Sequence, residues 1–254
     1  MAATVASALP QTCCPAVWLW PGYGLYAGPS LELGHHSGSV WCLVVGVDRD
    51  LSVTANGRTV TSRTALVPPR VDHELDTHGG RLMSCYLDPS SGRAGTCRDQ
   101  CRESPNGIFV DHSARGALTT MPSDTDRAWQ WLERAAPASV QTMDPRIAAA
   151  MTRINVAPSE APPLRELAAE AGLSESRFLH LFRRDAGTSL RRYRSWARLL
   201  CVGAAIAAGR SLTEASAEAG FASPSHLSDT FKATFGLTAS QLLASGAAVH
   251  VVAD

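Results

Sequence analysis

Residues 164–187 read LRELAAEAGLSESRFLHLFRRDAG, and residues 212–236 read LTEASAEAGFASPSHLSDTFKATFG. Both stretches have an alanine-rich apolar segment, a glycine at Gly172 or Gly220, and a second segment whose apolar residues recur four positions apart. Matching residues lie about 48 positions apart before the glycine and about 49 after it, as an internal repeat with one insertion would. The pattern predicts two helix-turn-helix units, of which the second has the longer turn by one residue.

Boundary residues support the same helices. Serine or threonine, whose side chain can accept a backbone N–H at a helix start, stands at each expected N-cap. These positions are Ser174, Ser211, Ser223 and Thr238. Glu214 and Gln241 complete two capping boxes, and Pro224 suits the first position of its helix. Between the units, residues 190–208 carry apolar residues at helical spacing up to Gly209, which predicts one connecting helix.

The face of each second helix opposite its apolar residues is polar and can contact DNA. It comprises Ser176, Arg177, His180, Arg183 and Arg184 in the first unit and Ser225, His226, Asp229 and Lys232 in the second. Arginine can bond a guanine edge through two N–H groups, while serine, histidine and lysine can contact bases or phosphates. Each face could instead be an ordinary solvated helix surface. Its repetition in two matching frames favours double-stranded promoter DNA as the partner. Four arginines on the connecting helix add to this expectation: Arg191, Arg192, Arg194 and Arg198.

The stretch from about residue 163 to residue 243 resembles the double helix-turn-helix domain of the AraC/XylS transcription regulators. The residues that carry the likeness in the second unit are Leu212, Glu214, Ala215, Ser216, Gly220, Phe221, Ser225, Leu227, Phe231, Lys232, Gly236 and Thr238. Ala239 stands where the family usually has proline, and Ala215 with Ser216 replaces isoleucine and alanine, so looser packing of this unit is expected. The resemblance implies a one-component regulator that couples a sensed signal to promoter binding, with RNA polymerase as a further partner.

Residues from about 17 to 118 are expected to form strands. Residues 40–47 are an apolar run rich in β-branched side chains, residues 52–62 alternate around Asn56-Gly57, and residues 81–87 suit a further strand. Short strands separated by Pro-Pro, Gly-Gly and Asn-Gly turns indicate a barrel or a sandwich. Residues 66–73 and 86–89 resemble the cupin-like sensor domain that many AraC/XylS regulators carry. The resulting fold class is α+β with two domains, a cupin-like β-barrel and an all-α double helix-turn-helix.

The domain boundaries follow from these assignments. The sensing domain is expected over residues 1–120, a helical connector and linker over 121–158, and the DNA-binding domain over 159–254. Helices are expected over residues 124–135 and 144–155, the second with Asp144 as N-cap and Pro145 at its first position. By resemblance to the family these helices make the contact of a homodimer; from the residues alone they could equally pack on their own barrel.

Histidines in the first domain test whether it is a metal-dependent enzyme. Cupin enzymes use a His-x-His pair followed by glutamate, because alternate strand residues share a face. This chain has His35 and His36 as neighbours, which should point to opposite faces, and only His73 from the second motif. We therefore expect no catalytic residue, metal or cofactor, and an enzyme of the cupin type remains the less favoured alternative. The three histidines either contact an unidentified small-molecule effector or pack inside the domain.

Cysteines offer another input signal. The chain has seven, which with no evident secretion signal argues against a disulfide framework. Cys97 and Cys101 lie in a polar stretch in which Arg98 and Arg102 could lower a thiol pKa. This predicts, as an alternative signal, a thiol-based redox or soft-metal sensor, with Cys13, Cys14 or Cys85 as further ligands; an exposed loop with incidental thiols is the other interpretation.

Charge and hydropathy place limits on the partners. Lysine plus arginine and aspartate plus glutamate number 23 each, so any basic surface must be local. The residues from Met1 to Pro10 lack a basic segment, and no apolar run approaches the roughly 20 residues that span a bilayer. A cytoplasmic protein without a membrane partner is expected.

Overall fold

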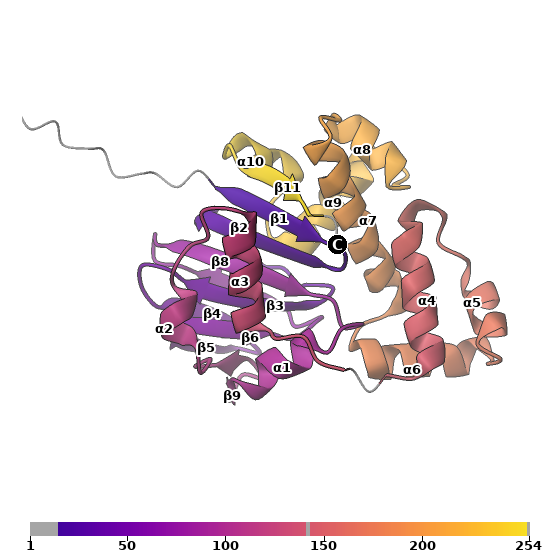
Figure 1. Ribbon diagram of the computed structural model, residues 1–254, viewed down its shortest axis with the longest axis horizontal. Helices are drawn as coiled ribbons and strands as arrows, with labels where there is room; N and C mark the ends of the chain where they lie inside the picture. The colour runs from indigo at the N-terminus through magenta and orange to yellow at the C-terminus, as the bar shows by residue number, and fades with distance from the viewer. Residues whose placement is uncertain (1–14, 141–142, 253–254) are drawn as a thin grey trace, which may run out of the picture.

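The computed structural model describes residues 15–140 and 143–252. Cys13, Cys14 and the Met1–Pro10 segment lie outside these residues. The chain forms a β-rich N-terminal part and a helical C-terminal part that lie side by side (Figure 1). The predicted fold class, an N-terminal β domain followed by an all-α double helix-turn-helix, is confirmed.

Two sheets make up the N-terminal part. The larger sheet has the strand order β11-β1-β2-β8-β3-β6-β10-β9, and the smaller has the order β5-β4-β7. The larger sheet contains β1 (Ala16–Trp20), β2 (Tyr23–Pro29), β3 (Trp41–Gly46), β6 (Thr64–Val67), β8 (Arg81–Leu87), β9 (Arg102–Glu103), β10 (Phe109–Val110) and β11 (Ala248–Val251). The smaller contains β4 (Leu51–Ala55), β5 (Arg58–Ser62) and β7 (His73–Asp76). All pairs inside the sheets are antiparallel except that of β1 with β11, which is parallel.

The predicted strands lie where the sequence pattern placed them. Asn56 and Gly57 join β4 to β5 with φ values of 51° and 70°, the two positive values that a tight hairpin turn requires. Strand β3 is apolar throughout because it is buried on both faces. Leu43 and Val45 belong to one hydrophobic cluster, whereas Cys42 and Val44 belong to another. Alternate residues of a strand point to opposite faces, so this strand separates two cores.

Different elements cover the two faces of the large sheet. Helices α1 (Arg93–Asp99), α2 (Arg115–Leu118) and α3 (Thr125–Ala135) lie over one face, where Trp131 and Leu132 of α3 join the core (Figure 1). The small sheet packs against part of the other face, with Val53 and Leu75 buried between them. The rest of that second face lies against the C-terminal helices.

The predicted helical connector and linker, residues 121–158, is divided between the two parts. Asp124 caps α3 by accepting from Arg127 N at 2.8 Å, and this helix packs on the sheet. Helix α4 (Pro145–Val156) begins after Asp144, as predicted, but Ile147, Met151 and Ile154 pack against the C-terminal helices. The connector is therefore two helices with different partners. Whether either of them also contacts a second copy of the chain stays a prediction.

Two helix-turn-helix units form the C-terminal part, as predicted. They consist of α5 (Leu164–Glu170) and α6 (Glu175–Ala186), then α8 (Leu212–Glu218) and α9 (Pro224–Phe235), joined by α7 (Leu190–Ala207). Residues 171–174 separate α5 from α6 and residues 219–223 separate α8 from α9, so the second turn is longer by one residue. Both predicted capping boxes form, at α8 and at α10 (Ala239–Ala244). A 3-10 turn, η1 (Pro158–Glu160), lies in the expected linker.

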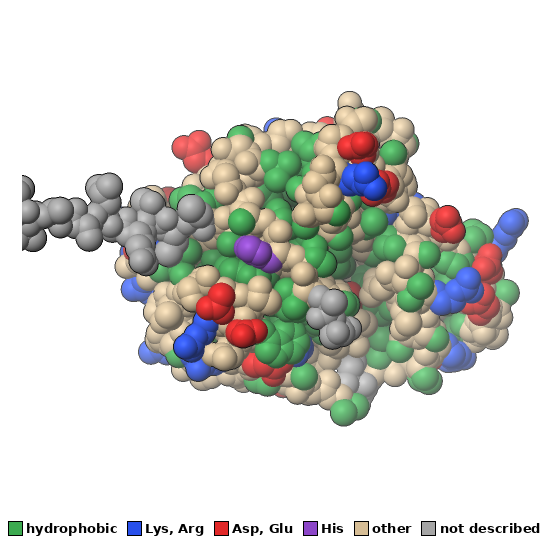
Figure 2. Space-filling view, turned by 45° about the horizontal axis from the view of Figure 1, so that its top comes forward, with side chains coloured by type: hydrophobic (Ala, Val, Ile, Leu, Met, Phe, Trp, Pro, Cys, Tyr) green, Lys and Arg blue, Asp and Glu red, His purple; other side chains and the backbone are tan. Residues whose placement is uncertain are grey.

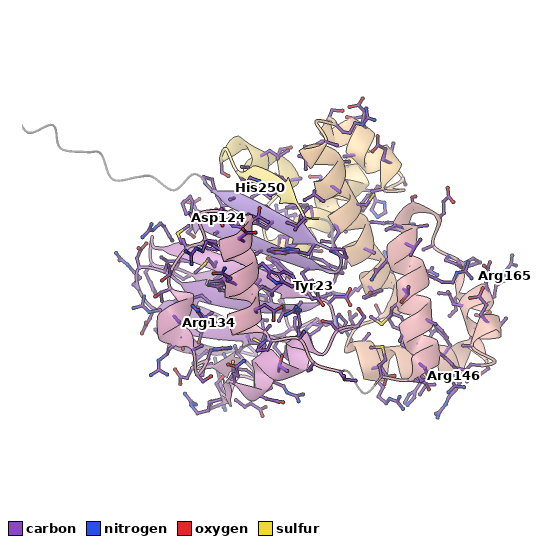
Figure 3. The ribbon with its side chains drawn as sticks, viewed as in Figure 1. Tyr23, Asp124, Arg134, Arg146, Arg165 and His250 are labelled. Atoms are coloured by element: carbon purple, nitrogen blue, oxygen red, sulfur yellow. The ribbon has the colours of Figure 1, made fainter. Side chains whose placement is uncertain are left out.

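Several sets of contacts join the two parts. Tyr193 of α7 donates to the buried Asp88 carboxylate at 2.8 Å and accepts from Asn155 of α4 at 2.8 Å. Burial raises the pKa of Asp88. A loop before β3 contacts the end of α9, where Gly34 N donates to Gly236 O at 3.0 Å. The last strand, β11, extends the large sheet, and His250 stacks on Trp18 with ring centroids 5.7 Å apart (Figure 3).

Gly236 is suited to its contact in two ways. Its φ of 81° lies in the left-handed region, which ends α9 and favours glycine. A Cβ at this position would lie 2.7 Å from Gly34 O, closer than any side chain could approach without displacing that loop. The loop and the helix end can therefore meet only through backbone atoms.

Candidate nucleic-acid interface and an apolar cavity

Helix α6 presents a polar face away from a closely packed core. Ser174 accepts from Arg177 N at 3.3 Å and fixes the helix start. Phe178, Leu181 and Phe182 are buried, and the aromatic ring of Phe182 meets that of Tyr193 edge-on at 5.6 Å. The predicted DNA-contacting residues are all exposed: Ser176, Arg177, His180, Arg183 and Arg184. Arg184 also pairs with Asp185 at 2.5 Å.

Helix α9 presents a similar face on a less complete core. Ser223 accepts from His226 N at 3.1 Å, and Pro224 occupies the first turn. Of its apolar residues, Leu227 is buried while Phe231 and Phe235 are only half-buried. Its predicted DNA-contacting residues are likewise exposed: Ser225, His226, Asp229 and Lys232. This face has one basic and one acidic residue, so it is electrostatically weaker than the arginine-rich face of α6.

The connecting helix departs from expectation in its use of arginine. Arg192 donates to Ser37 O at 3.1 Å, and Arg198 donates to Pro158 O at 3.3 Å. Arg194 donates to Pro162 O. These three guanidinium groups therefore fasten α7 to neighbouring loops, and their clustering in the sequence is no evidence for DNA contact; Arg191 is the exposed one of the four.

The three candidate effector histidines do not act together. His36 and His73 are buried, bridged through their backbones, with ring centroids 4.2 Å apart. Their Nδ1 atoms face Gly34 O at 2.8 Å and Val71 O at 3.0 Å, which fits neutral rings that donate to carbonyls. Burial lowers the pKa of His36 to about 4. His35 is exposed and lies 3.4 Å from Glu74. A role in effector binding stays a prediction, although the packing interpretation accounts for the buried pair.

The cysteine pair is not in an exposed polar loop, contrary to one expectation. Cys97 is fully buried on α1, where its hydrogen bond with Cys101 and its burial raise the thiol pKa well above the usual range. Arg98 and Arg102 do not lower it, because they pair with Asp99 and Asp111 instead. Polar neighbours in the sequence were misleading here, since helix α1 turns Cys97 inward and Arg98 outward, while Arg102 is exposed on β9.

His112 is the neighbour of the thiols that the sequence did not reveal. One ligand atom each from Cys97, Cys101 and His112 lies within 4.8 Å of the others. Both ring nitrogens of His112 already have backbone partners, Ala135 O at 2.9 Å and Ala114 N at 3.1 Å. To bind here, a thiophilic ion would have to break one of these two hydrogen bonds of His112 and replace the protons of both thiols. Redox or soft-metal sensing at Cys97 and Cys101 stays a prediction.

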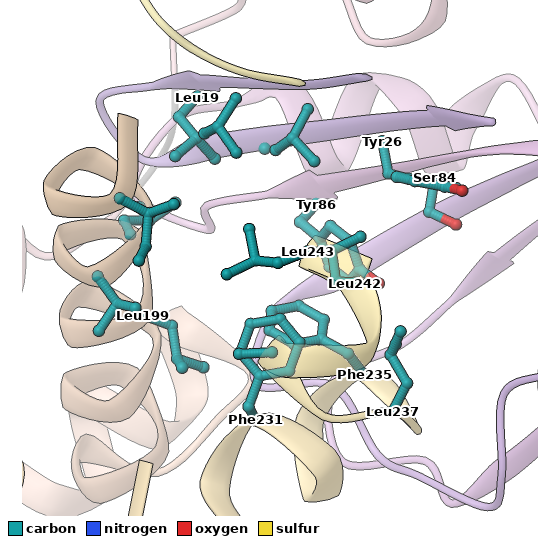
Figure 4. Close-up of a pocket in the computed structure, with 18 of the residues that line it drawn as sticks. Leu19, Tyr26, Ser84, Tyr86, Leu199, Phe231, Phe235, Leu237, Leu242 and Leu243 are labelled. Atoms are coloured by element: carbon teal, nitrogen blue, oxygen red, sulfur yellow. The ribbon is translucent and has the colours of Figure 1, made fainter. Parts of the chain in front are cut away.

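An apolar cavity of about 130 Å³ lies between the large sheet and the C-terminal helices (Figure 4). Strands β1, β2, β8 and β11 form one wall, and α7, α9 and α10 form the other. Aliphatic and aromatic side chains dominate its lining, among them Leu19, Leu199, Phe231, Phe235 and Leu243. Sequence reasoning missed this cavity because its walls come from opposite ends of the chain. None of His35, His36 and His73 lines it.

On the face that Figure 2 shows, charged side chains do not form a single patch. Figure 2 shows hydrophobic side chains along the middle of one face and charged side chains mainly around its edges. Towards the right-hand end, near α4 and α5, acidic and basic groups alternate, as in the pairs of Arg153 with Glu166 and Glu170. Within residues 15–140 and 143–252, no helix is long and apolar enough to cross a membrane.

The comparison with protein families concerns the two helix-turn-helix units. Residues 167–245 match a family model described as "Helix-turn-helix domain". These residues therefore form a helix-turn-helix domain, which supports the resemblance to the AraC/XylS regulators over this part of the chain. A domain of this kind supports DNA binding by the C-terminal part of the chain. No curated protein sequence matches the chain.

Solved structures share the fold of nearly the whole chain. A structure of ToxT from Vibrio cholerae has a TM-score of 0.55 and 10% identity, covering 88% of this chain and 98% of that one. ToxT from the same organism with a bound unsaturated fatty acid has a TM-score of 0.55 and 11% identity, covering 90% of this chain and 94% of that one. At such identities the likeness concerns the arrangement of the domains.

Proposed function

We propose that this regulator binds specific promoter sequences through α6 and α9 together, and that a ligand held by the N-terminal part changes this binding. The carrying observation is that both recognition helices keep their polar faces exposed while the continuous helix α7 lies between the two units. In helix-turn-helix proteins the second helix of each unit enters a major groove, and successive grooves on one face of DNA lie about 34 Å apart. A footprint over two adjacent groove faces is expected.

Charge on the two faces supports unequal roles. The α6 face has three arginines, which suit bidentate bonds to guanine and ion pairs with phosphate. The α9 face has Lys232 as its basic residue beside Asp229, so it gains less from phosphate neutralisation. We therefore expect α6 to provide most of the affinity for DNA. We expect α9 to be the recognition helix whose contact with DNA a ligand can strengthen or weaken.

Arg177→Ala in the full-length protein tests the assignment. Operators would first be selected from random duplexes, and binding of selected and scrambled duplexes would then be measured at several salt concentrations. If Arg177 reads a base edge, the variant loses about 1–3 kcal/mol and relaxes preference at one base pair. If it contacts phosphate, all sequences weaken alike and the salt dependence becomes shallower.

The matched control is Arg134→Ala, which removes an exposed arginine of α3 on the N-terminal part (Figure 3). It should leave both affinity and base preference unchanged. Equal effects of the two substitutions, or a selected footprint confined to one groove face, would contradict the proposal.

The fatty acid bound in one ToxT structure supports a ligand-binding role for this architecture. In the present chain, the apolar cavity between the large sheet and the C-terminal helices is the place where we expect a ligand to bind. Occupancy at that place would act directly on the position of α9, since Phe231 and Phe235 of this helix line it.

A further inference from the structure

The wall of the cavity on the sheet side is set by strand register. Val17 pairs with Val249 of β11 and with Tyr26 of β2, and Tyr26 pairs with Ser84 of β8. Residues that are directly opposite across a sheet share a face, so these four side chains form a row along the wall. Ser84 lies on β8, the last strand of this wall, between the apolar Leu82 and Tyr86, which line the same cavity.

Ser84 supplies a polar group that the protein leaves without a partner. Its side chain is polar in a residue only 4% exposed, and its hydroxyl has no hydrogen bond to any of the described residues. The hydroxyl of Tyr26, which also lines the cavity, is engaged with Pro29 O at 2.8 Å. The Ser84 hydroxyl opens onto the cavity and is therefore available to bond a ligand oxygen.

Nothing charged belongs to the lining among the residues that the structure describes. A carboxylate placed there would lose its hydration without gaining a cation, which strongly disfavours an ionised ligand. The volume of about 130 Å³ is close to that of an apolar cavity of about 150 Å³ that binds benzene in an engineered protein. The size therefore suits a single six-membered ring with small substituents.

The opposite wall connects this space to α9. Phe231 and Phe235 project from the helix that carries Lys232 and Asp229, and they pack against each other at 4.5 Å between ring centroids. The backbone of the same helix is held by the loop before β3, since Ser37 N donates to Ala233 O at 3.1 Å. A molecule that fills the space would complete the packing of α9 against the sheet.

We propose that this cavity binds a neutral, mainly apolar small molecule with one hydrogen-bonding oxygen, of the monocyclic phenol class, with the oxygen at Ser84 and the ring against Phe231 and Phe235. The effect of binding on DNA rests on the proposed function; the binding itself does not.

Binding of three probes to the full-length protein tests the site: p-cresol, toluene and benzoate, measured by calorimetry and by the shift in melting temperature. p-Cresol should bind more tightly than toluene by about three- to tenfold, the range of one net hydrogen bond, and benzoate should not bind. Ser84→Ala should abolish the preference for p-cresol over toluene while leaving toluene binding unchanged. Binding of benzoate as tight as that of p-cresol, or failure of p-cresol to bind, would overturn the proposal.

A second variant fills the cavity with a larger side chain. Leu243→Trp on α10 places a larger side chain into the lining and should abolish binding of both apolar probes. Val140→Trp, at an apolar residue 97% exposed, adds the same side chain outside the cavity and should bind them normally. Should Leu243→Trp fail to fold, Ser84→Ala still decides. Unchanged p-cresol binding in a folded Leu243→Trp variant would place the ligand elsewhere.

The DNA measurement separates this inference from the proposed function. With p-cresol bound, backbone amides of α9 should exchange hydrogen more slowly, and affinity for the selected operator should change. Selected DNA binding without any p-cresol binding would refute the cavity proposal only. Binding of p-cresol by a protein that recognises no duplex would leave the cavity proposal intact and refute the regulator function.

Discussion

Ser216 shows how one residue reduces the stability of the second helix-turn-helix unit. It stands where related regulators usually have alanine, is 1% exposed, and its hydroxyl has no hydrogen-bond partner among the described residues. In the first unit the equivalent position is Ala168, which is buried without this cost. Serine in place of the usual alanine therefore leaves a buried polar group without a hydrogen bond at this position.

Ser216→Ala should stabilise the protein by about 1 kcal/mol, because it removes a buried hydroxyl whose hydration was lost for no bond. Urea unfolding followed by circular dichroism would show a higher midpoint with an unchanged slope. Ser195→Ala, in which a half-exposed serine of α7 loses a bond to Arg191 O, is the control and should not stabilise. A lower midpoint for Ser216→Ala would mean that the hydroxyl has a partner in solution.

The buried histidine pair predicts a loss of stability in mild acid. Burial lowers the pKa of His36 to about 4 and also lowers that of His73, whereas both would titrate near 6.5 in the unfolded chain. The unfolded state then binds more protons over this interval, so stability is complete above pH 6.5 and falls as the pH approaches 4. For His36 the loss is at most about 3 kcal/mol.

Unfolding measured from pH 7.5 to 4.5 would check this. The double variant His36→Gln and His73→Gln should lose less stability across the interval than the parent, and His35→Gln, at an exposed residue, should behave like the parent. An identical pH profile in the double variant would assign the acid sensitivity to other groups.

Some residues were predictable because their environment is local. Each serine or threonine predicted as an N-cap accepts, through its side chain, a hydrogen bond from the backbone N–H three residues later, and this spacing can be read directly from the sequence. These residues are Ser174, Ser211, Ser223 and Thr238. The burial of Cys97 was not predictable, because it depends on contacts of α1 with a sheet distant in the chain.

At the scale of elements, the two recognition helices differ in how completely they are packed. Phe182 of α6 is fully buried in a core shared with α4 and α7. Its counterpart Phe231 of α9 is half-buried and lines the cavity. The looser second unit expected from the sequence is consistent with this contrast, although the empty space lies towards the N-terminal sheet, which no local pattern could indicate.

Phe182→Ala should therefore destabilise the protein by about 3–5 kcal/mol, the cost of removing a buried aromatic side chain. Phe231→Ala should cost clearly less, since the wild-type side chain already faces unfilled space. Denaturant titrations of both variants test the ranking, and equal costs would contradict the difference in packing.

The packing of α4 determines at which residue a stable DNA-binding fragment has to begin. The sequence suggests a domain over residues 159–254, but Ile147, Met151 and Ile154 of α4 lie in the core formed by α6 and α7. A fragment of residues 143–254 should melt cooperatively at a higher temperature than one of residues 159–254. Both lack the N-terminal sheet, so the difference isolates α4; a fragment from residue 159 that is equally stable would refute its structural role.

At the scale of the whole molecule, β11 ties the end of the chain to its beginning. Ala248 N donates to Pro15 O at 2.9 Å and Val252 N donates to Leu19 O at 2.8 Å. Removal of residues 248–254 should increase hydrogen exchange at the β1 amides and loosen α10, while α5 and α6 keep their protection. Val249→Thr keeps the backbone pairing and should preserve protection of β1. Unchanged exchange after truncation would show that the pairing contributes nothing to the connection of the two parts.

Parallel pairing of β1 with β11 also bears on how the protein is made. The two strands are separated by roughly 230 residues, which take on the order of 10–50 s to synthesise. During that time the nascent sheet emerges from the ribosome with the outer edge of β1 unpaired, and an unpaired edge readily accepts a strand from another chain. A neighbouring polypeptide that has just been released carries the matching segment, so exchange of β11 between two copies is the characteristic assembly error to expect at high expression.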